Sequence, residues 1–148
     1  MKRVIVVSAF ALALLAGPSV AAHAAQPPTS PASNTATVCD ASGATVVKGL
    51  TEFMKELDKA GAAATSGDIA ASQASVKQSG AMLIDLAGKL RKDVEPAQSS
   101  ELKKAVEDVA KEMEIQGRNL SGDLASVQNF NSKQIEDLSE KVNEICTK

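Results

Sequence analysis

The chain has 148 residues, of which 16 are basic and 18 acidic, so its formal net charge at neutral pH is −2. A mildly acidic chain without a block of basic residues argues against nucleic acid as a partner and against adsorption to anionic membranes. It contains one histidine and neither tryptophan nor tyrosine, so its core must be almost entirely aliphatic.

The first 24 residues are predicted to form a secretory signal peptide. Lys2 and Arg3 precede a short apolar run, and Ala22-His23-Ala24 supplies the small residues that flank a cleavage point. The apolar run is shorter than the about 20 residues that a membrane span needs. We therefore expect cleavage after Ala24, no membrane insertion of the product, and a bacterial protein that is secreted or held in the cell-envelope space.

Removal of this segment would leave a chain without histidine, and most catalytic and metal-binding chemistry needs that residue. Catalysis of the Ser-His-Asp and Cys-His types uses an imidazole as the general base. Ordinary zinc sites need histidine or several thiolates, and di-iron sites in helical bundles need Glu-x-x-His pairs. We therefore predict a protein that is not an enzyme and that has no catalytic residues, no metal site and no cofactor.

Residues 25–38 contain three prolines and many hydroxyl side chains but no charge, which is typical of a disordered arm. A spacer or a glycosylated stalk is the alternative for this segment. From Asp40 onward Pro96 is the only proline, and apolar residues recur at helical spacing. This pattern predicts a helical domain over residues 39–148.

Four helices are predicted, at residues 43–61, 67–93, 97–127 and 132–146. Each helix has an apolar stripe that is expected to face the core. In the first two helices the stripes are Val46, Val47, Leu50, Phe53, Met54 and Leu57, and Ile69, Val76, Leu83, Leu86, Leu90 and Val94. In the last two they are Leu102, Val106, Val109, Met113, Gly117, Leu120, Leu124 and Val127, and Ile135, Leu138, Val142 and Ile145.

Several residues are predicted to mark the ends of these helices. Gly61 is the expected stop for the first helix, and Pro96 favours a turn between the second and third. Ser99 or Ser100 is a candidate cap for the third helix. Asn131 or Ser132 is expected to cap the last helix, with Gln134 placed to reach back to Asn131 in a capping box. The helical spacing of apolar residues continues through Ser121-Gly122, which predicts an unbroken third helix; a break at that point is the alternative.

Cys39 opens the helical region and Cys146 nearly closes it. Two long central helices flanked by two shorter ones form an all-α, up-down four-helix bundle in which these cysteines lie at the same end. A disulfide needs Cα atoms within about 7 Å, which this topology allows, and export favours the oxidised state. We predict a Cys39–Cys146 bond that clamps the termini, in preference to two redox-active thiols without Cys-x-x-Cys spacing.

The second predicted helix is unusually rich in small side chains between Ile69 and Ala81. Such residues let a neighbouring helix approach closely, with Gly80, Gly88 and Gly117 marking the contacts, or they leave a slot for a ligand or a partner helix. The residues expected to line such a slot are Met54, Val76, Gly80, Met82, Leu83, Met113 and Gly117. Because Met54 and Met113 lie on apolar stripes, they are interpreted as core residues and not as haem ligands.

The acidic residues have the spacing from lysines that is typical of solvated helix faces. A catalytic acid pair ranks last, and Glu112 and Glu114 are the first residues that would test it. The leading hypothesis is a small secreted, non-enzymatic helical protein that binds another protein or assembles with itself. The alternative is an extracellular carrier that holds an apolar small molecule between its helices.

Overall fold

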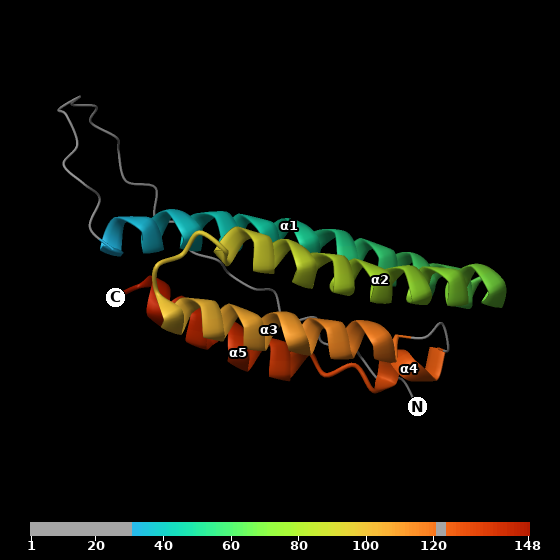
Figure 1. Ribbon diagram of the computed structural model, residues 1–148. Coiled ribbons are helices and arrows are strands. Elements are labelled where there is room, and N and C mark those ends of the chain that lie inside the picture. The colour runs from blue at the N-terminus through green and yellow to red at the C-terminus, as the bar shows by residue number, and fades with distance from the viewer. Residues whose placement is uncertain (1–30, 121–123) are drawn as a thin grey trace, which may run out of the picture.

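The computed structural model describes residues 31–120 and 124–148, and within these ranges the chain is helical without strands (Figure 1). The helices are α1 (Pro31–Thr65), α2 (Ile69–Val94), α3 (Ser100–Asn119), α4 (Leu124–Gln128) and α5 (Ser132–Cys146). The predicted all-α class is confirmed. The predicted signal peptide and residues 25–30 of the predicted arm lie outside the described residues.

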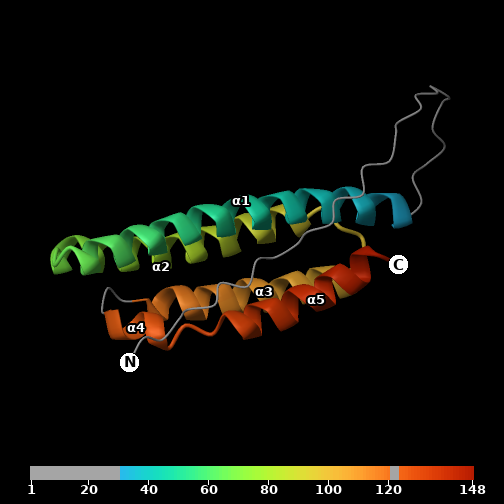
Figure 2. The same ribbon diagram turned by 180° about the vertical axis from the view of Figure 1, so that it is seen from behind.

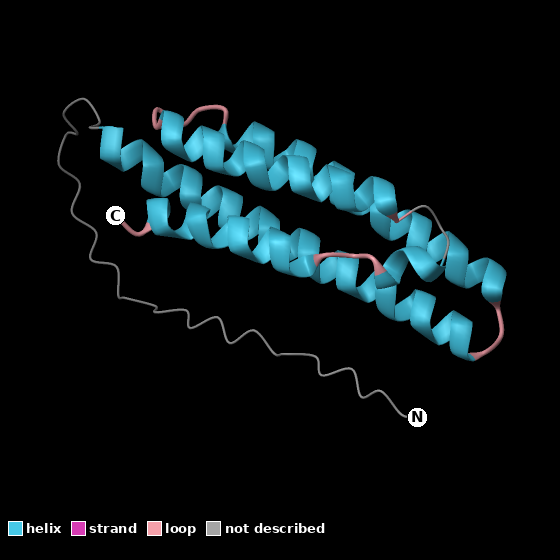
Figure 3. Ribbon diagram, turned by 90° about the horizontal axis from the view of Figure 1, so that it is seen from below, coloured by secondary structure: helices cyan, strands magenta, loops and turns pink. Residues whose placement is uncertain are grey.

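The helices are arranged in two layers. α1 and α2 lie side by side in one layer, and α3 and α5 lie together in the other (Figures 1 and 2). α1 packs closely along α2, and α2 along α3; α3 in turn contacts α5, whereas contacts between α1 and α5 are sparse. The short α4 lies at the far end of α3, and the turn between α1 and α2 projects beyond it. Figure 3 shows the same helices from below, with the α3 and α5 layer toward the viewer.

α1 extends further toward the N-terminus than predicted: it begins at Pro31 and not at residue 43. A proline fits the first turn of a helix, where its missing N–H leaves no bond unmade. Further along, the Asn34 side chain accepts a hydrogen bond from the backbone N–H of Gln98 at 3.1 Å. Val38 is only 3% exposed within the main apolar cluster. These long-range contacts account for helix in residues 31–38, where a disordered arm was predicted.

The turn between α1 and α2 follows Thr65, so the predicted stop at Gly61 is wrong. Gly67 makes the turn with a φ of 82°, a left-handed conformation that glycine adopts without a Cβ clash. Asp68 then caps α2 by accepting a hydrogen bond from the backbone N–H of Ala71 at 3.0 Å. The predicted start of this helix is confirmed to within two residues.

The turn between α2 and α3 agrees with the sequence pattern around Pro96. α2 ends at Val94, and the Ser99 hydroxyl caps α3 by accepting from the backbone N–H of Leu102 at 3.1 Å. Ala97 lies between them and is only 4% exposed. Burial of Ala97 in the main apolar cluster holds this otherwise exposed turn against the core.

The prediction of one continuous helix over residues 97–127 is wrong. α3 ends at Asn119, and Leu120 has a non-helical ψ of 69°. Ser121 and Gly122 themselves lie outside the described residues. The apolar rhythm does not reveal the break because it continues across it: Leu120 is buried, and Val127 of α4 packs against the same cluster.

The core consists of two adjoining clusters of mainly aliphatic residues. The cluster near the disulfide contains Val38, Leu86, Ala87, Leu90, Val94, Ala97, Leu102, Val106, Val109, Ala110, Met113 and Ile135. The cluster nearer the α1–α2 turn contains Phe53, Ala60, Val76, Leu83 and Leu120. The rings of Phe53 and Phe130 meet there, with centroids 5.4 Å apart.

Three residues of the predicted core stripes face solvent instead. Val47, Met54 and Ile69 are 51%, 48% and 48% exposed. Val47 and Met54 each follow a residue that packs in the core, Val46 and Phe53, and successive residues point about 100° apart around a helix. The first predicted stripe was therefore too wide for one buried face.

Candidate functional site

The predicted slot between the second and third helices is a close backbone contact. A Cβ added at Gly80 would lie 2.3 Å from the carbonyl oxygen of Gly117, and one added at Gly117 would lie 2.6 Å from the carbonyl oxygen of Gly80. Both glycines are buried. Tight helix packing, and not a slot, explains the small residues at this point. Gly88 has no atom within 4 Å of its added Cβ, so its predicted contact is wrong.

The other residues expected to line a slot do not share one open surface. Val76, Leu83 and Met113 are fully buried in the core. Met82 is half-buried on α2, and Met54 is exposed on α1, so only the core prediction for Met113 holds.

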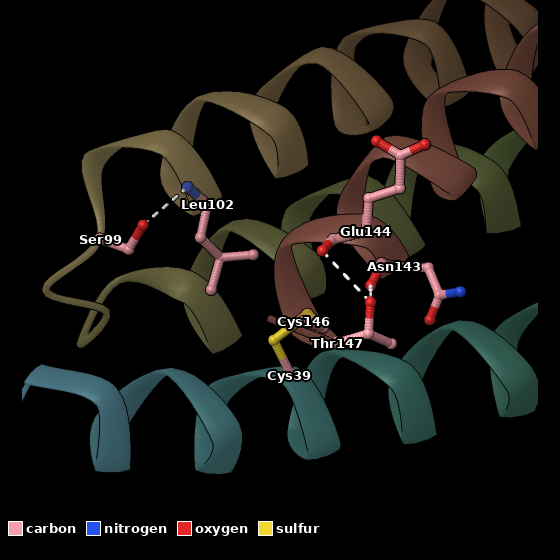
Figure 4. The surroundings of a disulfide bond; sticks show 7 residues. All are labelled: Cys39, Ser99, Leu102, Asn143, Glu144, Cys146 and Thr147. Atoms are coloured by element: carbon pink, nitrogen blue, oxygen red, sulfur yellow. Dashed lines mark hydrogen bonds between the residues drawn. A yellow bond between two sulfur atoms is a disulfide. The ribbon is translucent and has the colours of Figure 1, made fainter.

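The predicted disulfide is present and joins Cys39 to Cys146, with Cα atoms 5.8 Å apart (Figure 4). Cys39 lies inside α1 and not before it, because the helix begins earlier than predicted. Cys146 is the last residue of α5, where Thr147 Oγ1 donates to the carbonyl oxygen of Asn143 at 3.0 Å. A bond that closes a loop of this size contributes about 4.7 kcal/mol in the chain-entropy model.

A buried polar network, which the sequence did not reveal, joins α3 to the start of α5. Glu112 and Gln116 are 6% and 5% exposed. The Glu112 carboxylate accepts from Gln116 Nε2 at 2.6 Å and from Gln134 Nε2 at 2.8 Å. The backbone N–H of Asn131 donates to Gln116 Oε1 at 3.1 Å. The prediction that Glu112 lies on a solvated face is therefore wrong.

The same network changes the predicted capping box at the start of α5. Asn131 caps the helix as expected, since its side chain accepts from the backbone N–H of Gln134 at 3.3 Å. The Gln134 side chain, however, donates to Glu112 and accepts from Asn131 Nδ2 at 3.4 Å, and the backbone N–H of Asn131 donates to Gln116 instead of Gln134. The side-chain amides of Gln116 and Gln134 thus form hydrogen bonds between α3 and the start of α5, in place of the local side-chain-to-backbone bond of a capping box.

A charged network links α2 to α3 nearer the surface. Arg91 Nε donates to Glu107 Oε2 at 2.7 Å, and its guanidinium also donates to Glu114. These hydrogen bonds lower the pKa of both glutamates below their ordinary values and raise the pKa of Arg91. Glu114, the second acid named for a catalytic test, is therefore held in an ion-pair network.

The outer face of α1 carries an apolar pair between two acidic residues. Asp40, Val47, Met54 and Asp58 are all exposed and follow one another at steps of seven, seven and four residues. These steps keep all four on one side of the helix. Neither aspartate forms an ion pair with a lysine or arginine of the described residues. We refer to these four residues as the α1 outer face.

Three further findings bear on the kind of site present. Within residues 31–120 and 124–148, no group of three or more histidine, cysteine, aspartate or glutamate residues is placed to hold a metal ion. Over the same residues, no helix combines the length and apolar character that crossing a membrane requires. No protein family, curated protein or solved structure matches the chain.

Proposed function

We propose that the protein is a small secreted, non-enzymatic helical module that binds a partner protein through the α1 outer face. The observation that carries the proposal is the exposure of Val47 and Met54, at 51% and 48%, seven residues apart on one helix. Two large apolar side chains spaced by seven residues on one exposed helix face match the anchor spacing by which amphipathic helices are recognised. The scaffold we infer is an up-down four-helix arrangement of α1, α2, α3 and α5, supported by the contacts between successive helices.

The charges of this face favour a basic amphipathic helix as the partner. Asp40 and Asp58 flank the apolar pair, and among the residues that the structure describes neither is ion-paired with a lysine or arginine. They lie 18 residues apart, which corresponds to about 27 Å along a helix. A partner helix with two apolar residues between lysines or arginines would match both the apolar and the acidic positions. Complementary charges of this kind favour encounter and set register more than they add affinity.

The carrier alternative has less support. It depends on space between α2 and α3, and there the Gly80 and Gly117 backbones are in direct contact. The methionines that motivated it are divided between the core, where Met113 lies, and the exposed surface, where Met54 lies.

Native mass spectrometry of the protein purified unreduced from its own culture medium tests the proposal. A second, basic polypeptide bound to the chain supports it. A clean multiple of the chain mass would establish self-assembly, and a small apolar adduct would establish a carrier; either result overturns the proposed partner.

Variants then test the surface itself. Val47→Ser combined with Met54→Ser should weaken partner binding, whereas Ile115→Ser, an equally exposed position on α3, should leave it unchanged. Asp58→Asn should weaken binding at low salt and have little effect at high salt, because salt screens exposed charges. Equal losses from the α1 variant and from Ile115→Ser would show that this face is not the binding site.

A further inference from the structure

α5 is the least buried of the long helices. Of its fifteen residues only Ile135, near its start, is buried, whereas α3 has eight buried residues among twenty. Leu138, Val142 and Ile145 are only partly buried where they pack against the main cluster. The second half of α5 is therefore attached to the bundle by a thin apolar contact.

The two ends of α5 are attached in different ways. At its start, Gln134 donates to Glu112, and the backbone N–H of Asn131 donates to Gln116, both on α3. At its end, Cys146 is bonded to Cys39 of α1, and apart from that bond α1 and α5 touch sparsely. Only the second attachment is covalent, and a thiol reductant breaks it while leaving the first unchanged.

The rest of the bundle has contacts that do not involve α5. The α1–α2 interface includes the bond from the Ser72 hydroxyl to the carbonyl oxygen of Ala60, at 2.7 Å. The α2–α3 interface includes the Gly80–Gly117 contact and the Arg91–Glu107 ion pair. Loss of the disulfide therefore removes the tether of α5 but none of these contacts.

We propose that the Cys39–Cys146 bond is a reducible latch that holds the second half of α5 over the apolar core, and that reduction opens this half while α1, α2 and α3 stay folded. Both cysteines are half-buried and not fully enclosed. A thiolate of a dithiol attacks one sulfur, the S–S bond breaks, and the other cysteine leaves as a thiolate that takes up a proton. The second thiol of the reductant then resolves the mixed disulfide, so two cysteine thiols and one oxidised dithiol result.

Opening would expose an apolar surface that the oxidised protein hides. The cluster against which Leu138, Val142 and Ile145 pack includes Val38 and Leu102, which are 3% and 0% exposed. Reduction by a thiol would thus uncover the part of the main apolar cluster that the second half of α5 covers. This surface is separate from the α1 outer face, and its exposure is independent of the function proposed above.

Native-state hydrogen exchange on the full protein, with and without dithiothreitol, tests the latch. Reduction should lower the protection of amides 138–146 by roughly tenfold more than that of amides in α2 and α3, as for a local opening. The Cys39→Ser, Cys146→Ser double variant should show the open pattern at once and should not respond to dithiothreitol. Binding of an apolar fluorescent dye should rise on reduction and fall on reoxidation.

Two results would overturn the proposal. Equal loss of protection in α2, α3 and α5 would mean that the bond holds the whole fold together and not α5 alone. Unchanged protection of amides 138–146 would mean that the apolar contacts of α5 suffice without the bond. If the double variant fails to fold, hydrogen exchange on the reduced natural chain still distinguishes these two results from the local opening of α5.

Discussion

Replacement of Gly80 by alanine should destabilise the protein, although alanine is the better helix former. In an unconstrained helix the change would add about 1 kcal/mol of stability. Here the new Cβ would lie 2.3 Å from the carbonyl oxygen of Gly117 and 2.8 Å from that of Leu120. Both atoms belong to the backbone, so no side-chain rotation relieves the overlap.

The size of the effect follows from the displacement that the overlap demands. Carbon–oxygen contacts are seldom shorter than about 3.3 Å, so α2 and α3 must separate by roughly 1 Å. Separation also loosens the packing of Val76, Leu83 and Met113, which are fully buried. Overpacking of this kind costs about 1–3 kcal/mol or more, and we expect a net loss of about 2 kcal/mol.

Gly88→Ala is the matched control, because Gly88 lies in the same helix with nothing within 4 Å of an added Cβ. It should stabilise the protein by about 1 kcal/mol. Urea unfolding followed by helical circular dichroism measures both variants from their midpoints at constant m-value. A Gly80→Ala variant as stable as the natural chain, or a Gly88→Ala variant that loses as much, would refute the close contact.

Three further predictions concern buried or paired polar groups. Ser42→Ala should leave the free energy of unfolding unchanged or raise it by about 1 kcal/mol in urea titrations, because the buried Ser42 hydroxyl has no hydrogen-bond partner in the described residues. Glu112→Gln should destabilise by about 1–3 kcal/mol, because the two N–H donors bind the two different carboxylate oxygens and an amide replaces one of these oxygens with a donor; hydrogen exchange should show the loss first at the start of α5. Because Arg91 lowers the folded-state pKa of Glu107 and Glu114, their contribution to stability is present above the unfolded pKa and is lost as pH falls through the folded values. Arg91→Gln should therefore flatten the fall in unfolding free energy between neutral and acid pH, and an unchanged slope would contradict the pairing.

The sequence was sufficient where local patterns decide structure. The capping roles of Ser99 and Asn131, the turn at Pro96 and the apolar spacing each depend on neighbouring residues, and each is present. The pairing of Cys39 with Cys146 followed from topology and is also confirmed.

Long-range contacts explain what the sequence did not show. The extension of α1 depends on Asn34 meeting Gln98, a residue 64 positions away. Glu112 has the spacing of a surface acid, and only the docking of α5 buries it. Met54 has the spacing of a core residue, but α1 meets its neighbours over a narrower face than its apolar pattern suggests.

The disulfide also determines how the chain responds to mechanical tension. Cys39 and Cys146 are 107 positions apart in sequence, and their Cα atoms are 5.8 Å apart. A force that pulls on the segments outside these two residues passes through the S–S bond and not through the residues between them, although residues 31–38 of α1 lie outside the bond and carry the load. Without the bond, the same force would unravel the helices and lengthen the chain by roughly 350 Å, at about 3.3 Å per residue. In the oxidised protein the chain between Cys39 and Cys146 is therefore almost inextensible under load, and the helical residues between the two cysteines are shielded from the pull.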